Sequence, residues 1–384
     1  MTRVLLAVNA GSSTLKFRAY QSGSQTLLLQ GLLDRFGSEQ AQLNIRDPHG
    51  QSHSHAIGKA GREAGVAAML AALAQHALIP EGVVHRVVHG GARYQQATAI
   101  TATVRSELET LIPLAPLHQP ASLAVIDAFS AQNAALPQLA CFDTAFHAGQ
   151  DSVATRFAIA RHWHDEGVRR YGFHGLSYAA INRQLPALGL AAARTVVCHL
   201  GSGASACAIH AGRSIASSMG FSALDGLMMG TRPGNLDPEV VLYWQEKHGM
   251  SVAAVRDELY KRSGLLGVSG ISADMRELLA STQPEAAQAI ELYCWRAARE
   301  VASLAAAMEG LDAVVFTAGV GEHAAEIRAR ILARLGWLGF ELDTQANNTR
   351  QTRLTKADSP RHAYVLATDE EGEMARQAAV FFTR

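Results

Sequence analysis

The chain has no excess of charge of either sign, because 34 of its 384 residues are Lys or Arg and 34 are Asp or Glu. Proteins that coat nucleic acid or bind anionic membranes through charge need a basic excess to neutralise phosphates. We therefore expect neither nucleic acid nor a membrane as a partner. With 48% hydrophobic and 18% charged residues, the chain is too apolar for a disordered segment, and its length predicts about two compact domains.

Cysteine is scarce, and no two cysteines form a CxxC pair; the four are Cys141, Cys198, Cys207 and Cys294. This argues against a disulfide framework or a cysteine-rich zinc site and favours a reducing compartment. The run Val4–Val8 is too short for a signal-peptide core, and Ala64–Pro80 falls short of the roughly 20 apolar residues of a membrane span. We expect a cytoplasmic protein.

Two common site motifs are also absent. The only Gly-Lys pair, Gly58-Lys59, is followed by Ala60, so the sequence has no GxxxxGK[ST] phosphate loop. Sixteen histidines raise the question of a metal centre, but none lies in an HExxH helix or a carboxylate-flanked cluster. A nucleotide or metal would have to bind by other means.

Apolar runs and turns predict an α/β protein, with sheets that are covered by helices. The expected strands are Val4–Val8, Phe17–Tyr20, Leu27–Leu32, Val83–His89, Leu139–Phe142 and Ala313–Thr317. The expected helices are Arg62–Leu78, Leu117–Ala131, Glu285–Met308, Ala324–Leu335 and Glu370–Phe382.

One design occurs twice along the chain. Leu5–Phe17 and Val196–Ile209 each read as a strand, a turn of Gly and Ser, and a second apolar strand. Two such hairpins suggest two related halves that face each other across a ligand-binding cleft. They could equally be two ordinary hairpins, because Gly and Ser dominate turns in general.

A third glycine turn, Gly319–His323, lies between a predicted strand and a predicted helix. Gly319-x-Gly321-x-x-Ala324, with Glu341 and Asp343 about 20 residues further on, matches the dinucleotide fingerprint locally. An NAD-linked oxidoreductase is therefore one reading. Against it, too little chain follows residue 343 to complete the usual nucleotide-binding halves.

Charged side chains lie at the ends of the predicted strands and in the turns. In the strand Val83–His89, alternation puts Arg86 and Val88 on one face, where a guanidinium beside an apolar side chain suits a small carboxylate with an alkyl tail. Asp143 ends another strand, and His174 and Arg232 lie in glycine-bracketed turns. Each alone is more typical of an ordinary surface residue or capped turn; their combination indicates a site.

Together these segments resemble the acetate kinase family, from Asn9 to Glu371. The motifs that carry the resemblance are Val8–Phe17, His85–Gly91, Ala115–His118, Phe142–His147, Arg170–Gly175, His199–Gly201, Ser218–Phe221, Gly226–Arg232 and Asp274–Arg276. The resemblance implies a duplicated actin-like (ribonuclease H-like) fold with a central cleft. One domain would span residues 1–147, joined by the helix 370–384, and a nucleotide-binding domain would span 148–369.

The resemblance also implies phosphoryl transfer between ATP and acetate, with Mg²⁺ or alternatively Mn²⁺, in a homodimer. It places the metal at Asn9 and Glu370, and the catalytic roles at Arg86, Asp143, His174 and Arg232. The acid would lie against Arg86, Val88, Leu117, Phe173 and Ala223. The nucleotide would bind Ser12, Lys16, His199, Leu200, Gly201, Ser202, Gly203, Asp274, Met275, Arg276, Gly319, Val320, Gly321, Glu322 and His323.

The chain departs from the family at three of these positions. Ser202 and His323 stand where the family usually has Asn, and Ala223 stands where it commonly has Pro. Because Ala223 would enlarge the acyl pocket, a propionate kinase is an alternative, and an ATP-driven switch with the same fold is another.

Acetate is already ionised at neutral pH, so its attack on the γ-phosphorus needs no general base. We expect direct in-line transfer, with an aspartyl phosphate on Asp143 as the alternative. Loss of Arg86 or Arg232 should remove most turnover while the chain folds normally.

Overall fold

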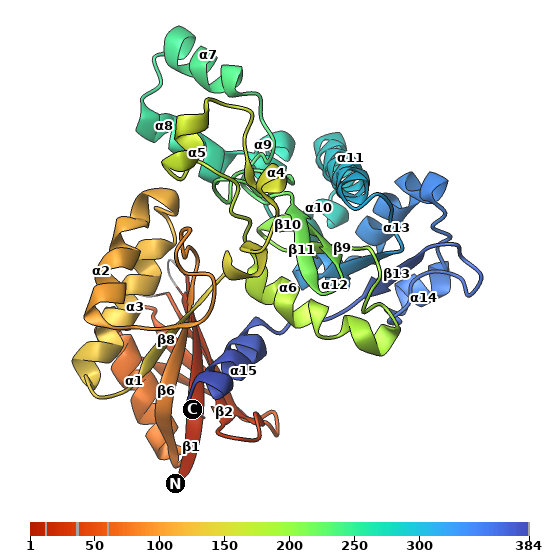
Figure 1. Ribbon diagram of the computed structural model, residues 1–384. Helices are drawn as coiled ribbons and strands as arrows, with labels where there is room; N and C mark the ends of the chain where they lie inside the picture. The colour runs from red at the N-terminus through yellow and green to blue at the C-terminus, as the bar shows by residue number, and fades with distance from the viewer. Residues whose placement is uncertain (12–13, 36–37, 60, 383–384) are drawn as a thin grey trace. The chain divides into compact units, whose positions relative to one another are not determined.

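The computed structural model describes residues 1–11, 14–35, 38–59 and 61–382, and the chain divides into two compact units. The first unit comprises Met1–Ala148 and Asp369–Arg384, and the second comprises Gly149–Thr368. The C-terminal segment therefore returns to the N-terminal unit (Figure 1).

Among the described residues, the first unit contains an eight-stranded sheet in the order β5-β4-β3-β2-β1-β6-β8-β7. Strands β1 to β5 form an antiparallel meander, and β6 and β8 run parallel to β1. The strands are β1 (Thr2–Ala10), β2 (Thr14–Gln21), β3 (Leu27–Asp34), β4 (Gln42–Arg46), β5 (Ser52–Ala56), β6 (Leu78–Val87), β7 (Thr98–Ala99) and β8 (Gln138–Phe142). Helix α2 (Ala102–Thr110) follows β7.

The two faces of this sheet differ because side chains alternate along each strand. Phe17 packs in the core that α1 (Arg62–Gln75) and α3 (Gln119–Gln132) cover. Arg18, the next residue, forms an ion pair with Asp369, directly before α15 (Glu370–Phe382). Helix α15 therefore lies on the opposite face of the sheet from α1 and α3, as Figure 1 shows.

The second unit contains a five-stranded sheet in the order β11-β10-β9-β12-β13, again counted over the described residues. Its strands are β9 (Thr195–Leu200), β10 (Ala204–His210), β11 (Arg213–Ser217), β12 (Ala313–Thr317) and β13 (His362–Val365). The helices are α4 (Ser152–Thr155), α5 (Arg161–Asp165), α6 (Gly175–Asn182), α7 (Pro238–His248), α8 (Val252–Asp257), α9 (Gly264–Ser269), α10 (Met275–Ala280), α11 (Pro284–Ala307), α12 (Ala318–His323), α13 (Ala325–Arg334) and α14 (Thr344–Asn348).

The two sheets share one topology. In each, an antiparallel meander of three strands is followed by two strands parallel to its first, giving the orders β3-β2-β1-β6-β8 and β11-β10-β9-β12-β13. The two predicted hairpins are the β1–β2 and β9–β10 pairs, in which Ala10 faces Leu15 and Leu200 faces Ala204. The prediction of a duplicated α/β fold is thus confirmed.

Three predicted boundaries were wrong around β6. The helix that we expected to reach Leu78 ends at Gln75, and β6 already begins at Leu78, because the chain turns at Ala77 with a φ of 56°. Pro80 is tolerated within β6 because a bulge follows it: Val4 faces Pro80, but Leu5 faces Gly82. At its other end, β6 stops at Val87 instead of His89.

A further correction concerns Gly319–His323, which we expected to be a turn. It forms most of the short helix α12. The backbone of Ala318, with a φ of 64°, redirects the chain directly from β12 into this helix, and the Glu322 carboxylate accepts the Ala318 N–H at 3.0 Å. Between the second and third glycine segments, helix α11 occupies the region of the predicted helix Glu285–Met308.

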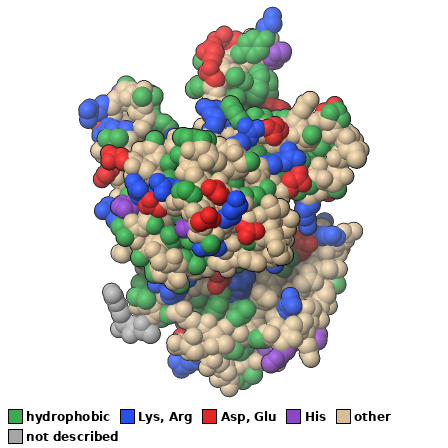
Figure 2. All heavy atoms as spheres, turned by 90° about the vertical axis from the view of Figure 1, so that its right-hand side faces the viewer, with side chains coloured by type: hydrophobic (Ala, Val, Ile, Leu, Met, Phe, Trp, Pro, Cys, Tyr) green, Lys and Arg blue, Asp and Glu red, His purple; other side chains and the backbone are tan. Residues whose placement is uncertain are grey.

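No helix within the described ranges is long and apolar enough to cross a membrane. On the face drawn in Figure 2, basic and acidic side chains are interspersed, as the balanced composition leads one to expect.

Candidate active site

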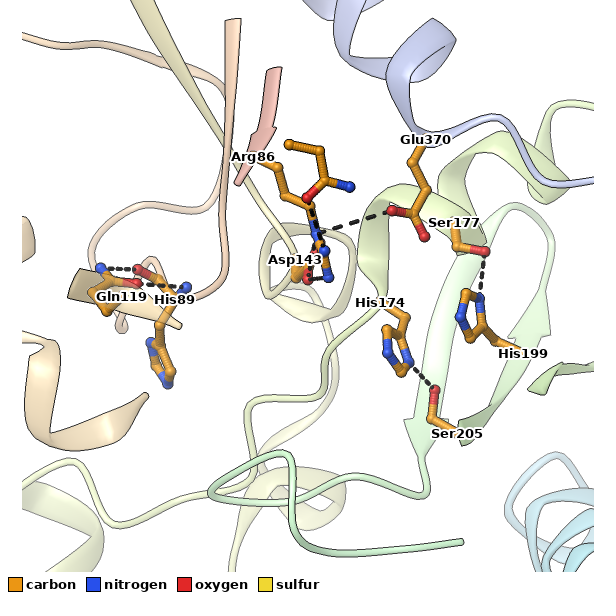
Figure 3. Close-up of polar contacts among 10 residues, drawn as sticks. Arg86, His89, Gln119, Asp143, His174, Ser177, His199, Ser205 and Glu370 are labelled. Atoms are coloured by element: carbon orange, nitrogen blue, oxygen red, sulfur yellow. Dashed lines mark hydrogen bonds and ion pairs between the residues drawn. The ribbon is translucent and has the colours of Figure 1, made fainter. Parts of the chain in front are cut away.

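Arg86 is the centre of a polar cluster in the first unit (Figure 3). It lies near the end of β6, and Asp143 follows the adjacent parallel strand β8, so the two side chains meet at one sheet edge. The Arg86 Nε donates to both carboxylate oxygens at 3.1 and 3.0 Å, and Nη2 donates to Oδ2 at 2.5 Å. The Nη1 atom donates to Asn9 Oδ1 at 3.2 Å.

These bonds leave part of the guanidinium available. A guanidinium has five N–H groups, of which Nε and one on each terminal nitrogen are used within the described part of the chain. One N–H on Nη1 and one on Nη2 remain, which is the donor pair that a second carboxylate requires. Asp143, whose side chain is 1% exposed, thus fixes the orientation of Arg86 but does not occupy all of its N–H donors.

Glu370, the first residue of α15, brings a second carboxylate to Arg86, with Oε2 3.9 Å from Nε. The pKa of Glu370 is raised to about 7, chiefly by burial; Asp143 and Glu371 also raise it, whereas Arg86 and Lys16 lower it. Burial would lower the pKa of Arg86, but the Asp143 and Glu370 carboxylates outweigh it, so this pKa is raised. Two carboxylates, those of Asp143 and Glu370, thus lie against the single guanidinium of Arg86.

A divalent cation fits this surplus of negative charge. The side-chain oxygens of Asn9 and Glu370 both lie against Arg86, and oxygen donors suit hard cations such as Mg²⁺ and Mn²⁺. No group of three or more His, Cys, Asp and Glu residues with metal-binding geometry occurs among the described residues, so the protein would supply few of the ligands itself. Few protein ligands are typical of Mg²⁺ bound together with phosphates.

The remaining candidates in the first unit are less closely assembled. Val88 is buried but lies beyond the end of β6, so the strand alternation that paired it with Arg86 does not hold there. Leu117, before α3, is 40% exposed. Lys16 and Glu371 line an open pocket of about 480 Å³ over β2 to β5. Ser12 lies outside the described residues.

In the second unit, two histidines form a stacked pair. The ring centroids of His174 and His199 are 4.2 Å apart, with 17° between the planes. The Nδ1 atom of His174 lies 2.8 Å from Ser205 Oγ, and the Nδ1 atom of His199 lies 2.8 Å from Ser177 Oγ (Figure 3). Each imidazole is thus held through the same ring nitrogen.

The turn between β9 and β10 lies against His174 and Arg232. A methyl group built on Gly203 would lie 2.7 Å from Arg232 Nη2 and 3.3 Å from His174 Nε2. The glycine at this position therefore allows both cation and imidazole to approach the backbone of the turn, and backbone N–H groups in such a turn can contact an anion. The predicted residues His174, His199, Gly203 and Arg232 are brought together.

Arg232 is a cation without an acidic partner in the described part of the chain. Its Nη1 atom donates to the Ala223 carbonyl at 2.7 Å, and burial lowers its pKa. An uncompensated cation in such a place is costly unless an anion binds it. Arg232 is therefore the strongest anion-binding candidate of this unit. Phe173, beside His174 in sequence, is buried.

Residues of the two predicted nucleoside segments, Asp274–Arg276 and Gly319–His323, and the predicted phosphate residue Ser202 form hydrogen bonds within the second unit. Asp274 caps α10, and its carboxylate accepts bonds from Arg276, chiefly the side chain, which lowers the pKa of Asp274 to about 2. Arg276 is exposed. His323 Nδ1 lies 2.6 Å from Arg350 Nη1, and the Ser202 carbonyl accepts the Gly230 N–H at 3.1 Å.

The carboxylates required for the dinucleotide reading are engaged elsewhere. Asp343 caps α14 by accepting the Ala346 N–H at 2.9 Å, and Glu341 pairs with Lys356 at 3.3 Å. The hypothesis of an NAD-binding site therefore lacks a free carboxylate to bind the ribose.

Sequence reasoning missed Ser205, Tyr178 and Ser177, whose hydroxyls contact the two histidines directly or through one another. One signal was available, because Tyr178 follows His174 by four residues, a spacing typical of neighbours on a helix, although His174 itself is the N-cap residue of α6. Ser205 and Ser177 carried no comparable signal.

Comparison with known proteins gives a consistent result. The model of the acetokinase family matches residues 4–376. A protein of Rhodopseudomonas palustris named acetate kinase is 46% identical over 98% of both chains, and an acetate kinase of Nitrobacter hamburgensis is 46% identical over 96% of this chain and 93% of its own.

Solved structures agree in fold. A propionate kinase from Francisella tularensis superposes with a TM-score of 0.93 at 34% identity, covering 98% of this chain and 99% of its own. The acetate kinase of Porphyromonas gingivalis superposes with a TM-score of 0.89 at 32% identity and covers both chains completely.

Proposed function

Since this chain belongs to the acetokinase family, we propose that it transfers the γ-phosphoryl group of ATP reversibly to acetate, giving acetyl phosphate and ADP. The observation that carries the proposal is the match to acetate kinases over nearly the whole chain. We propose acetate and not propionate as the substrate, because the relatives named acetate kinases are 46% identical to this chain, whereas the propionate kinase is 34% identical. Membership of the family implies ATP as co-substrate and a divalent metal ion.

We assign the acid to Arg86, whose two remaining N–H groups suit a carboxylate. Asp143 orients Arg86 by occupying the other side of the guanidinium. Val88, Leu117, Phe173 and Ala223 remain the proposed apolar contacts of the methyl group. In this role Asp143 is no nucleophile, since both of its oxygens accept from Arg86.

We assign the moving phosphoryl group to Arg232 and His174, because phosphoryl transfer depends on positioning and charge stabilisation. Asn9 and Glu370 would hold Mg²⁺, which neutralises charge on the nucleotide phosphates when bound. Ser12, Lys16 and His199–Gly203 would contact those phosphates, and Asp274–Arg276 with Gly319–His323 would hold the nucleoside.

We further infer a cytoplasmic homodimer. Helix α7 buries none of its residues within the described chain, and Leu242 and Tyr243 on it are 48% and 52% exposed. Large exposed apolar side chains on one helix favour a covered surface.

Hydroxylamine trapping tests the proposed reaction. With ATP, Mg²⁺ and acetate, propionate or butyrate in parallel, we expect an acyl hydroxamate, with the highest kcat/KM for acetate. A higher value for propionate would support the propionate alternative, and hydroxamate from none of the acids would contradict the proposal.

Gly203→Ala should lower kcat by about 100-fold, because the added methyl would lie 2.7 Å from Arg232 Nη2 and 3.3 Å from His174 Nε2 and would displace both groups. Gly336→Ala is the matched control, since no atom lies within 4 Å of the position of its methyl group. Steady-state kinetics of both variants checks this, and wild-type kcat in Gly203→Ala would argue against the assigned turn.

The raised pKa of Glu370 predicts a pH-dependent stability. In the metal-free chain the proton is bound up to about pH 7, whereas the ordinary pKa is 4.5. The contribution of Glu370 to the free energy of unfolding is therefore largest below pH 4.5 and is lost as the pH rises through 7. Relative to Glu370→Gln, the wild type should lose up to about 3 kcal/mol of unfolding free energy over this window.

Urea unfolding at several pH values measures this difference, and Mg²⁺ should reduce it, because a cation favours the ionised carboxylate. Glu326→Gln is the control: Glu326 forms an exposed helix pair with Arg330, so its effect should stay within about 0.5 kcal/mol at every pH. A Glu370→Gln difference that does not change with pH would contradict the assignment.

A further inference from the structure

A chain of two buried hydroxyls, those of Tyr178 and Ser205, ends at the partly buried His174. Ser205 Oγ lies 2.8 Å from His174 Nδ1 and 2.5 Å from the Tyr178 hydroxyl oxygen. Tyr178 lies in α6, four residues after the N-cap residue His174, and Ser205 lies in β10. The side chains of Tyr178 and Ser205 are completely buried. Fully buried hydroxyls that contact one another constrain where each proton can be.

The protons in this chain can be assigned from chemistry. Burial raises the pKa of Tyr178 well above its ordinary value, so the phenol keeps its proton and is able to donate it. If the Tyr178 O–H donates to Ser205 Oγ, the Ser205 proton is directed to His174 Nδ1. The Nδ1 atom is then an acceptor, and the proton of the neutral imidazole resides on Nε2.

The other ring nitrogen is directed at the glycine turn. The position of a Gly203 methyl group would be 3.3 Å from His174 Nε2 and 2.7 Å from Arg232 Nη2. The backbone of His174 has a φ of 58°, in the left-handed region that non-glycine residues rarely adopt, so the surrounding structure determines this side chain's direction.

We propose that Ser205 and Tyr178 are positioning residues that keep the His174 proton on Nε2, so that a neutral imidazole donates a hydrogen bond at the Gly203 turn beside Arg232. The identity of the acceptor, a phosphoryl oxygen, rests on the proposed function. The opposite tautomer would direct a lone pair at that oxygen. A protonated His174 would place a second positive charge beside Arg232 and against the stacked ring of His199. Repulsion between these charges favours the neutral form of His174.

The stacked partner repeats the arrangement. His199 Nδ1 contacts Ser177 Oγ at 2.8 Å, and Ser177 Oγ contacts Thr368 Oγ1 at 2.8 Å. Anchoring through Nδ1 directs the Nε2 atom of His199 to Gly201, whose added methyl would lie 3.6 Å from it. Both imidazoles therefore present the same nitrogen to the same turn.

Nitrogen NMR of protein labelled with ¹⁵N-histidine tests the tautomer directly, without requiring activity. The His174 signals are identified by their absence in His174→Gln. At neutral pH we expect Nδ1 to resonate as an unprotonated ring nitrogen and Nε2 as a protonated one, and Ser205→Ala should give a mixture. A proton on Nδ1, or on both nitrogens, in the wild type would overturn the proposal.

Kinetics tests the consequence. Ser205→Ala and the nearly isosteric Tyr178→Phe should each lower kcat by about 10- to 100-fold, as is usual for groups that orient a functional histidine. The KM values for ATP and acetate should change by less than about twofold. Two variants are used because one buried substitution could impair folding, which thermal unfolding reports.

Ser214→Ala is the matched control, since Ser214 is a buried, hydrogen-bonded serine of the same sheet, bonded to Gln150 and Cys207. It should keep wild-type kcat. Wild-type kcat in both Ser205→Ala and Tyr178→Phe would overturn the positioning role. A chain that makes no acyl phosphate at all would refute the proposed function, while the NMR result would still decide the tautomer.

Discussion

Arg232→Ala should lower kcat by about 10³-fold or more while the free energy of unfolding changes by less than about 1 kcal/mol. The reason is that Arg232 has a backbone carbonyl as partner and no carboxylate among the described residues, so its charge is uncompensated until an anion binds. Without Arg232 the transition state loses a stabilising cation, which lowers kcat. The folded state also no longer holds a partly buried charge, so the free energy of unfolding changes little.

Arg213→Ala is the control, because Arg213 likewise donates to a backbone carbonyl, that of Gly149 at 3.0 Å, but lies on the exposed end of β11. It should retain wild-type kcat. Arg232→Lys should recover little, since a lysine keeps the charge but not the planar donor fork. Steady-state kinetics with urea unfolding checks all three variants; normal turnover in Arg232→Ala would remove this residue from the mechanism.

Arg86→Ala should lower kcat by at least about 10³-fold and also destabilise the fold by about 3–5 kcal/mol. Here the structure changes the expectation from sequence, which was that the variant folds normally. Asp143 is 1% exposed and both of its oxygens accept from Arg86, so loss of the guanidinium leaves a buried carboxylate unpaired. Glu370 would lose the cation with which it pairs as well.

The double variant Arg86→Ala/Asp143→Ala separates the two effects. It should recover most of the stability, because no unpaired charge remains, but none of the turnover. Arg105→Ala is the control: Arg105 binds Asp127 through Nε and Nη2 and is 24% exposed, close to the 22% of Arg86, but Asp127 is 52% exposed. Its loss should cost at most about 1 kcal/mol. Recovery of kcat in the double variant would contradict the role of Arg86.

Local pattern predicted the two hairpins and the strand-end positions of Arg86 and Asp143, because apolar runs and small-residue turns are encoded in consecutive residues. It failed for the hairpin of β4 and β5, because β5, Ser52–Ala56, is polar and exposed. A strand of this kind forms by pairing with its neighbour and carries no apolar alternation of its own.

The partners of the candidate residues were also beyond sequence reasoning. Arg86 and Asp143 are 57 residues apart, and Glu370 reaches them only because the chain returns to the first unit at Asp369. Ser205 contacts His174 across 31 residues. Such contacts depend on which strands become neighbours, and the local sequence does not encode that.

The central claim is that the acid itself attacks the γ-phosphorus, while Asp143 holds Arg86. The most direct test uses ATP made chiral at the γ-phosphorus with sulfur and oxygen isotopes and determines the configuration of the acetyl thiophosphate formed. We predict inversion, as a single in-line transfer requires. Retention would contradict this account, because it demands two transfers through a phosphorylated residue such as Asp143.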